Sequence, residues 1–294
     1  MPELPEVETL RRELSSAIKG KTIKKAIIKW SKMVKPLTPA EFQRKIKNKR
    51  ILGIDRRAKV LILELSAGSF LLIHLKLTGQ LIYQAGKLAS KQAGKLVVGG
   101  HPQKGGIENL PNKFTHIILE FKDDSTLYFN DLRKFGWARL VGKLEVDKLL
   151  SEFGPEPLSK DFSINYFKSI LKKYPNRKIK QILMDQGLIA GVGNIYCDES
   201  CFCAKVKPTR SVKSLKEIEV KILFNCIPKI LKFAIAKKGT SADTYVQLDG
   251  KPGGMIPYLK VYSRQKQKCK RCQARIEKIK LNGRGTHFCP QCQR

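Results

Sequence analysis

The sequence predicts an α+β protein with an antiparallel β-sandwich domain that starts with a helix, a helical domain, and a small C-terminal metal module. Three observations support this division: short β-rich runs separated by turn residues, a later region of helical apolar spacing, and two Cys-x2-Cys pairs near the C-terminal end. A chain of 294 residues is long enough for about two domains with cores of their own. We place the domains at 1–145, 155–238 and 239–294.

The N-terminal domain begins with a predicted helix and continues as strands. Residues Glu3–Lys19 carry Leu10, Leu14 and Ile18 at helical spacing, and Gly20 ends the helix. Apolar runs punctuated by Gly, Pro, Asn and Asp then predict an antiparallel sheet or sandwich. The predicted strands are Lys24–Trp30, Lys59–Leu65, Phe70–Leu77, Thr115–Phe121 and Thr126–Leu132.

Two further stretches organise the rest of the chain. Residues Gln84–Asn112 are rich in Gly and Lys without a clear period, which predicts a long loop. Gly154–Pro157 has the composition of a hinge, and apolar residues recur at helical spacing from Ile164 to about Lys238. A helical domain is therefore expected after the hinge.

The charge of the chain indicates a polyanionic partner. Lysine and arginine number 58 against 25 acidic residues, a formal net charge of +33. Nucleic acid fits such an excess first and an anionic membrane surface second, while a generally basic proteome is the alternative. The sequence has no apolar run of about 18 residues and no signal-peptide pattern, so we expect a cytoplasmic protein without a membrane partner. Its eight cysteines are then expected to be metal ligands or free thiols.

Four cysteines near the C-terminal end have the spacing of a metal site. Cys269, Cys272, Cys289 and Cys292 form the pattern C-x2-C-x16-C-x2-C. Two such pairs predict one tetrahedral zinc site that holds a small β-hairpin. We expect this zinc to be structural, because four thiolates saturate the ion and leave no position for a catalytic water.

The other four cysteines are Cys197, Cys201, Cys203 and Cys226. Cys197 and Cys201 lie i,i+4 on a predicted helix, a spacing that could support a metal pair, but no histidine lies near them in sequence. We therefore interpret all four as buried free thiols.

The N-terminal segment Met1–Glu8 is suited to covalent chemistry. Removal of Met1 exposes the secondary amine of Pro2, and an α-amino group has a pKa of about 8 compared with about 10.4 for a lysine. Such an amine can attack an electrophilic carbon and form a cationic iminium, with the Glu3 carboxylate beside it for proton transfer. The alternative is an ordinary helix N-terminus, where proline and glutamate are favoured in any case.

The segment from Met1 to Leu14 closely resembles the start of bacterial formamidopyrimidine-DNA glycosylases. The resemblance continues in order to residue 294 and is weakest at 84–112 and at Ser263, where glycine is usual. It implies a bifunctional enzyme that excises oxidised purines, such as 8-oxoguanine and formamidopyrimidines, and nicks the strand by β,δ-elimination. In this family, Pro2 would be the nucleophile and Glu3 the proton donor.

The resemblance implies two further catalytic residues. Lys59, in Arg56-Arg57-Ala58-Lys59, matches a lysine that transfers protons and binds phosphate. Arg284, in Asn282-Gly283-Arg284-Gly285-Thr286, matches a hairpin arginine that contacts phosphates and donates a proton in the second elimination. Without the resemblance, these would be a basic strand edge and a Gly-flanked turn with a solvated arginine.

The resemblance also implies a set of DNA contacts. Ile73–Gly79 matches a loop that would contribute His74 and Leu77, although methionine is usual at the latter position. Asn130–Gly136 matches a second loop, in which Arg133 and Phe135, together with Leu77, would fill the gap left by a flipped nucleotide. A core aromatic is the alternative for Phe135.

Phosphate contacts are implied in the helical domain. Gly191–Glu199 matches the family's helix-two-turn-helix, in which Asn194 would bind phosphate, and Lys180 matches a phosphate-binding lysine. The stretch 239–254 resembles the loop that closes over the flipped base.

The expected partner is double-stranded DNA containing oxidised bases, bound by a monomer. Two rival interpretations remain open. One is the same chemistry on oxidised pyrimidines, as in endonuclease VIII, although that branch usually has a glycine in place of Leu4. The other is a zinc-ribbon DNA-binding protein without catalytic activity.

Overall fold

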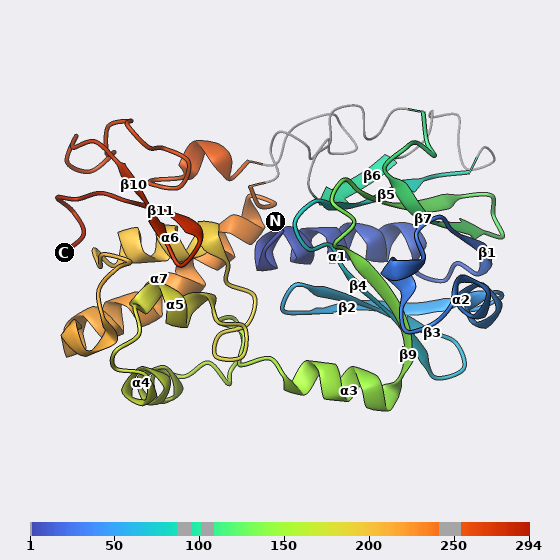
Figure 1. Ribbon diagram of the computed structural model, residues 1–294, viewed down its shortest axis with the longest axis horizontal. Helices are drawn as coiled ribbons and strands as arrows, with labels where there is room; N and C mark the ends of the chain where they lie inside the picture. The colour runs from blue at the N-terminus through green and yellow to red at the C-terminus, as the bar shows by residue number, and fades with distance from the viewer. Residues whose placement is uncertain (1, 87–95, 101–108, 241–253) are drawn as a thin grey trace. The chain divides into compact units, whose positions relative to one another are not determined.

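The structure is a computed structural model that describes residues 2–86, 96–100, 109–240 and 254–294. These residues form two units (Figure 1). Each unit has its own hydrophobic core. The N-terminal unit comprises 1–151 and 237–254, and the helical unit comprises 152–236 and 255–294. No helix among the described residues is long and apolar enough to cross a membrane.

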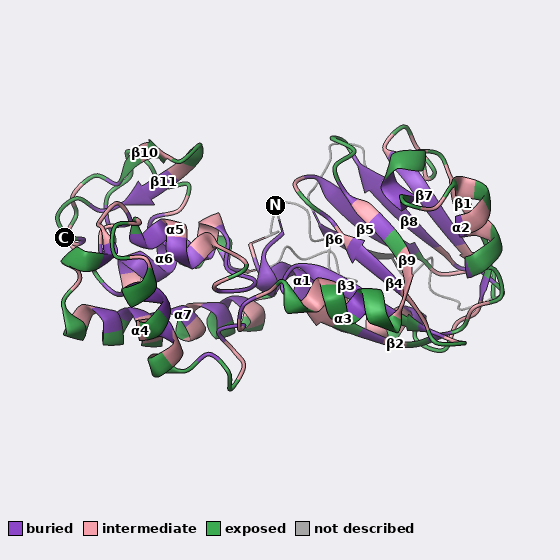
Figure 2. Ribbon diagram, turned by 60° about the horizontal axis from the view of Figure 1, so that its bottom comes forward, coloured by how far each residue is buried: buried purple, intermediate pink, exposed green. Residues whose placement is uncertain are grey.

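The N-terminal unit is an antiparallel β-sandwich, as predicted. One sheet has the strand order β1-β7-β8-β5-β6 and the other the order β2-β3-β4-β9. The strands are β1 (Ile23–Ile28), β2 (Ile51–Arg57), β3 (Val60–Leu65), β4 (Ser69–His74), β5 (Gly79–Gln84), β6 (Leu96–Gly100), β7 (Thr115–Phe121), β8 (Thr126–Asp131) and β9 (Trp137–Gly142). Strands β7 and β8 are buried along almost their whole length (Figure 2).

Helices border the sandwich. They are α1 (Leu4–Ile18), α2 (Pro39–Ile46) and α3 (Lys143–Ser151), with a short 3-10 helix η1 (Ser31–Val34). The apolar side of α1 joins the core between the two sheets through Leu10, Leu14 and Ile18, which are at most 1% exposed. The predicted N-terminal helix and the five predicted strands are therefore present, while α2, α3, β2, β5 and β9 were not predicted.

The expectation of a long irregular loop over Gln84–Asn112 is wrong in part, because β6 lies within it and pairs with β5. Two of the glycines in this stretch, Gly99 and Gly100, are required by close packing. A Cβ on Gly99 would stand 2.3 Å from Leu10 Cδ1, and one on Gly100 would stand 2.2 Å from the Gly79 carbonyl oxygen. These contacts leave no room for a side chain.

The helical unit contains the four helices of the predicted helical domain and a two-stranded hairpin. They are α4 (Ile164–Lys173), α5 (Ile179–Met184), α6 (Asn194–Cys203) and α7 (Glu217–Ala236), with short 3-10 helices η2 (Val212–Ser214) and η3 (Ile256–Tyr258). The hairpin consists of β10 (Glu277–Leu281) and β11 (Arg284–Phe288). Its small core includes Phe202 of α6 beside Cys269 and Cys289. The hairpin therefore belongs to the same unit as the helices, whereas the sequence suggested a separate domain over 239–294.

The expectation of four buried free thiols is wrong for two of the cysteines. Cys203 of α6 and Cys226 of α7 form a disulfide with their Cα atoms 5.9 Å apart. Cys197 and Cys201 are buried and free, as expected. The pairing joins residues 23 positions apart on two neighbouring helices, so it depends on how these helices pack and leaves no signal in local spacing.

Candidate functional site

The N-terminal end of α1 is buried and held by carboxylates. Pro2 is buried, and Glu3 is only 2% exposed as the residue that caps the helix. The backbone N–H of Glu3 donates to Glu6 Oε2 at 2.9 Å, which completes a capping box. The other oxygen of Glu6 accepts from the backbone N–H and the hydroxyl of Thr240 at 2.8 and 3.0 Å. Gly239 is required beside this bond, because a Cβ there would lie 2.6 Å from Glu6 Oε1.

Lys59 follows a tightly held turn between β2 and β3. Ala58 has a positive φ of 54°, a conformation that costs energy for a residue other than glycine. Arg56 binds this turn by donating from Nη1 to the Ala58 carbonyl at 2.9 Å, and it donates from Nε to Glu8 Oε2 of α1 at 3.2 Å. Lys59 is 6% exposed, so it is buried directly after a turn that Arg56 connects to α1.

The β4–β5 turn and the β8–β9 turn are joined by one buried carboxylate. Asp131 is 0% exposed and accepts hydrogen bonds from the Thr78 hydroxyl, from the Gly136 N–H at 2.7 Å and from the Arg133 N–H at 3.2 Å. The Arg133 N–H also donates to Thr78 Oγ1 at 3.0 Å. The two loops that were predicted to enter the DNA are therefore held next to each other.

The side chains at these turns point away from the core. Phe135 is 51% exposed, which rules out a place in the sandwich core, and Arg133 stacks on its ring at 4.7 Å. Leu77 is half-buried. Leu132 is 56% exposed on the same turn, which the sequence did not indicate, because an apolar residue at a strand end resembles a core residue in sequence. The turn after β8 thus carries two exposed apolar side chains and one cation, next to the turn that carries Leu77.

His74 lies at the end of β4 with a neutral ring. Its Nδ1 accepts the N–H of Lys76 at 2.8 Å, and its ring lies 5.6 Å from that of Trp137. Burial, together with the charges of Lys76 and Lys59, lowers the pKa of His74 from 6.5 to about 3. The hydrogen bond to Nδ1 leaves the ring proton on Nε2, so His74 can donate a hydrogen bond at neutral pH without carrying charge.

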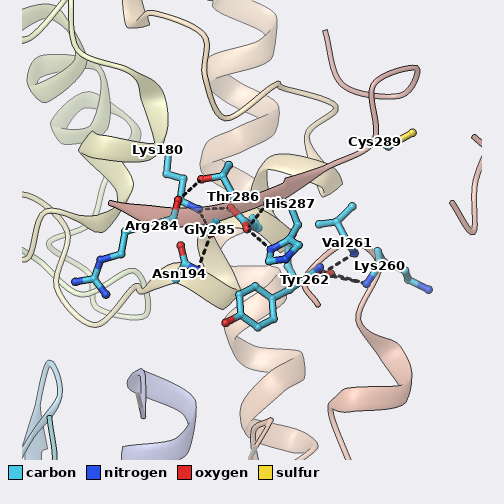
Figure 3. A network of polar contacts seen from close by, with 12 residues as sticks. Lys180, Asn194, Lys260, Val261, Tyr262, Arg284, Gly285, Thr286, His287 and Cys289 are labelled. Atoms are coloured by element: carbon cyan, nitrogen blue, oxygen red, sulfur yellow. Dashed lines mark hydrogen bonds and ion pairs between the residues drawn. The ribbon is translucent and has the colours of Figure 1, made fainter. Parts of the chain in front are cut away.

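In the helical unit, the predicted phosphate-binding residues meet the hairpin (Figure 3). Lys180 of α5 is 2% exposed and donates to Asp198 Oδ1 at 2.6 Å. Asn194 Nδ2 donates to the Gly285 carbonyl at 2.9 Å, and Lys180 Nζ lies 3.4 Å from the same oxygen. Arg284, which begins β11, is exposed.

A cavity of about 280 Å³ lies between α5 and the hairpin. Three cations, Arg177, Lys180 and Arg284, line it together with one carboxylate, Asp185. Arg177 forms an ion pair with Asp185 at 3.1 Å and Lys180 forms one with Asp198 at 2.6 Å, so the positive charge that suits an anion comes mainly from Arg284.

Four thiols converge beside the hairpin. The sulfur atoms of Cys269, Cys272, Cys289 and Cys292 all lie within 4.8 Å of one another. Two of the separations are 3.4 Å, between Cys272 and Cys289, and 3.9 Å, between Cys269 and Cys292. A tetrahedron with metal–sulfur bonds of about 2.3 Å has edges of about 3.8 Å, so the four residues fit one metal ion.

Comparisons with known proteins cover the whole chain. The formamidopyrimidine-DNA glycosylase N-terminal domain matches residues 1–138, the H2TH domain of the same proteins matches 153–246, and the zinc finger found in FPG and IleRS matches 266–294. The formamidopyrimidine-DNA glycosylase of Listeria monocytogenes is 40% identical over 100% of both chains. This chain belongs to the formamidopyrimidine-DNA glycosylase family. The family enzyme of Carboxydothermus hydrogenoformans is 37% identical, again over 100% of both chains.

Solved structures of Lactococcus lactis Fpg share the fold of this family member. One is a complex with an abasic site containing DNA, at 37% identity, 99% coverage of both chains and a TM-score of 0.85. Another, of a mutant with a Fapy-dG containing DNA, matches at 37% identity, 100% coverage of both chains and the same TM-score. A third, with an oxidised pyrimidine containing DNA, matches at 36% identity, 100% coverage of both chains and a TM-score of 0.83.

Some expectations fall outside what the structure describes. Met1 and residues 241–253, which include most of the loop expected to close over the base, lie outside the described residues. Sequence reasoning also missed the buried carboxylates Asp131 and Asp198, whose partners are distant in sequence and leave no local pattern.

Proposed function

We propose that this member of the glycosylase family is a bifunctional DNA glycosylase and AP lyase that excises oxidised purines, such as 8-oxoguanine and formamidopyrimidines. The observation that carries the proposal is the pair Pro2–Glu3, buried at the head of α1 in a chain that matches the family throughout. The Lactococcus lactis complex with a Fapy-dG containing DNA supports the choice of lesion.

In the proposed reaction, the Pro2 amine attacks C1′ of a flipped nucleotide and the bond from C1′ to the base breaks. The base leaves with the electrons of that bond and a proton. Glu3 donates a proton to the sugar ring oxygen O4′, the bond between C1′ and O4′ breaks, and a cationic iminium forms between Pro2 and C1′. The iminium acidifies the 2′ proton, which permits β-elimination and then δ-elimination. Burial of Pro2 and Glu3 supports this chemistry, because a site that excludes water strengthens electrostatic interactions with the reacting atoms.

Lys59 and Arg284 are the further catalytic residues we propose. Lys59 transfers protons and binds phosphate from the turn that Arg56 holds. Arg284 contacts the phosphates at the lesion and donates a proton in the second elimination, which its exposed position on the hairpin permits. Lys180 and Asn194 bind phosphate in the same unit, and the cationic cavity shared by Lys180 and Arg284 supports this.

Four groups of the N-terminal unit stabilise the opened duplex in this proposal. Leu77 and Phe135 enter the gap left by the flipped nucleotide, and Arg133 faces the orphaned base. The exposure of Phe135 and Arg133 supports these roles. His74 donates a hydrogen bond from its neutral ring to the DNA backbone.

The metal is one structural zinc ion, which Cys269, Cys272, Cys289 and Cys292 would hold. Thiolate ligands and the fit of four sulfur atoms to a tetrahedron favour zinc. Zinc supplies folding energy to the hairpin when bound and takes no part in the reaction.

The proposed partner is double-stranded DNA containing oxidised bases, bound by a monomer in the cytoplasm. The net charge of +33 and the Lactococcus lactis complexes with damaged DNA support the DNA partner. One chain carries all three family modules, which supports a monomer as sufficient for activity. Light scattering of the protein–DNA complex measures this stoichiometry.

Competition between lesions tests the proposed substrate. A labelled 8-oxoguanine:C duplex should be nicked, and unlabelled purine lesions should compete better than oxidised pyrimidines. The Lactococcus lactis complex with an oxidised pyrimidine favours pyrimidine lesions as the second candidate. Stronger competition by pyrimidine lesions would replace the proposal with an activity like that of endonuclease VIII, and binding without nicking would leave only a DNA-binding protein.

A further inference from the structure

Asp198 is a fully buried carboxylate that joins two parts of the helical unit. It lies on α6 with 0% exposure. Its Oδ1 accepts from Lys180 Nζ of α5 at 2.6 Å. Its Oδ2 accepts from the backbone N–H of His287 on β11 at 2.8 Å and lies 3.3 Å from the ring Nδ1 of the same residue. A carboxylate this deeply buried needs such partners. Asp198 therefore binds both α5 and the hairpin, through Lys180 and His287, which Figure 3 labels.

Further contacts hold β11 nearer its beginning. The Gly285 carbonyl accepts from Asn194 Nδ2 at 2.9 Å and lies 3.4 Å from Lys180 Nζ. Gly285 follows Arg284 directly, and His287 lies three residues after it. Because Arg284 is exposed, packing of its own side chain does little to set its position. The backbone bonds of Gly285 and His287, together with the pairing of Arg284 with Leu281 of β10, therefore hold the backbone from which the Arg284 side chain extends.

A neighbouring carboxylate binds the segment 260–262, which precedes the four cysteines. Glu199, also on α6, accepts the backbone N–H groups of the three residues 260–262 at 2.9 to 3.1 Å. This segment leads into the four-cysteine hairpin. Residues 260–262 and the hairpin strand β11 are thus both bound to α6. Of the two carboxylates, Asp198 makes the contact that lies closer in sequence to Arg284.

We propose that Asp198 is a positioning residue for Arg284. By binding Lys180 with one oxygen and His287 with the other, it fixes β11 against α6 and so sets where Arg284 meets the DNA. The inference rests on the proposed function in one respect, the contact between Arg284 and a phosphate.

Charge alone predicts the opposite effect of removing Asp198. Asp198→Asn deletes a negative charge beside the cationic cavity and releases Lys180 from its ion pair, so simple electrostatics predicts tighter binding to DNA. Loss of positioning predicts weaker binding and a shallower salt dependence, by about 0.9 in the log–log slope for each phosphate that the protein no longer neutralises. Whether Asp198→Asn binds DNA more tightly or more weakly than wild type therefore distinguishes the electrostatic effect from the loss of positioning.

The experiment is a double-mutant cycle on duplex binding. Wild type, Arg284→Ala, Asp198→Asn and the double variant are titrated with a duplex that contains a tetrahydrofuran abasic-site analogue, which cannot be cleaved. We expect Arg284→Ala and Asp198→Asn each to weaken binding about tenfold, and the double variant to bind no more weakly than either single variant. Losses that multiply to about a hundredfold would overturn the proposal, as would binding by Asp198→Asn at wild-type strength or tighter.

Asp161→Asn is the matched control, because it removes the same charge from an exposed position in the same unit. In the Asp161→Asn background, Arg284→Ala should weaken duplex binding by the same factor as it does in wild type. Thermal unfolding and metal content establish whether Asp198→Asn folds. If it does not, the pair Lys180→Met/Asp198→Leu replaces the buried ion pair with apolar groups of similar size, an exchange that folded proteins often tolerate. In that background, Arg284→Ala should no longer weaken binding to the duplex. If it weakens binding by the same factor as in wild type, the proposal is overturned.

Failure of the proposed function would be visible separately. The binding cycle uses an uncleavable duplex, so an enzyme without lyase activity would still report on Asp198. If Arg284→Ala binds the duplex as strongly as wild type does, Arg284 does not contact the DNA. The positioning role of Asp198 is then overturned as well.

Discussion

Arg56 of β2 donates its Nε hydrogen to Oε2 of Glu8 on α1 at 3.2 Å. This bond joins the helix that directly follows Pro2 and Glu3 to the turn that precedes Lys59. Burial alone would raise the pKa of Glu8, but hydrogen bonds from Arg11, Arg12 and Arg56 lower it from 4.5 to about 2. The ion pair between Glu8 and Arg56 therefore connects the segments that carry the three proposed catalytic groups of the N-terminal unit, Pro2, Glu3 and Lys59.

The lowered pKa of Glu8 predicts a loss of stability in acid. A carboxyl whose pKa is lower in the folded state stabilises the fold above its ordinary value of 4.5, and that contribution is lost as pH falls through about 2. Glu8→Gln should lower the free energy of unfolding by about 1–2 kcal/mol at pH 7, because solvent screens the partly exposed arginines, and by less at pH 3. Urea unfolding across this range measures it. Glu64→Gln, at an exposed position on β3, is the control, and a Glu8→Gln deficit independent of pH would contradict the assignment.

Metal binding should be necessary for DNA binding and not for the fold of the N-terminal unit. We expect one zinc per chain, and Cys289→Ser should lose both the metal and the binding of a lesion-containing duplex, because the hairpin folds around the ion. Elemental analysis and a binding titration measure these losses. Cys197→Ala, which changes a cysteine outside the cluster, should keep one zinc. Metal-free protein that binds the duplex at full strength would show that the ion is dispensable.

Phe135→Ala should affect duplex opening more than stability. The side chain is 51% exposed, so its removal should change the free energy of unfolding by no more than about 0.5 kcal/mol. Excision of 8-oxoguanine from a duplex should slow, while cleavage at a pre-formed abasic site should slow less, because that site needs less unstacking. Single-turnover rates on the two substrates test this against Leu144→Ala, an 83% exposed apolar residue of α3. Equal losses on both substrates would remove Phe135 from the opening step.

The features that could be predicted from the sequence are those that leave a local signal. The apolar period of α1, the punctuation between strands and the spacing of Cys269 to Cys292 each lie within a short window. Asp198 could not be predicted, because an acidic residue within a helix is typical of a solvated face and its partners lie 18 and 89 positions away. The bond between Glu6 and Thr240 joins residues 234 positions apart. Such pairings follow from tertiary packing, as does the disulfide.

The disulfide between Cys203 and Cys226 should stabilise the helical unit. Closing a loop of 23 residues lowers the conformational entropy of the unfolded chain, which should raise the free energy of unfolding by about 3 kcal/mol. Urea unfolding with and without dithiothreitol measures the difference, and Cys226→Ala should remove the response to the reductant. Wild-type protein whose unfolding midpoint ignores the reductant, with two additional thiols that react with iodoacetamide, would show that the bond does not form.

The nucleophile is the central element of the proposed function. With borohydride present, the protein should form a covalent adduct on an 8-oxoguanine:C duplex, because reduction fixes the iminium between Pro2 and C1′. Peptide mapping should find the DNA on a peptide that begins at Pro2 and lacks Met1, and a variant that retains Met1 should form no adduct. Glu3→Gln should reduce excision of the base far more than cleavage of a pre-formed abasic site. An adduct on Lys59, or no adduct despite full strand cleavage, would contradict the mechanism.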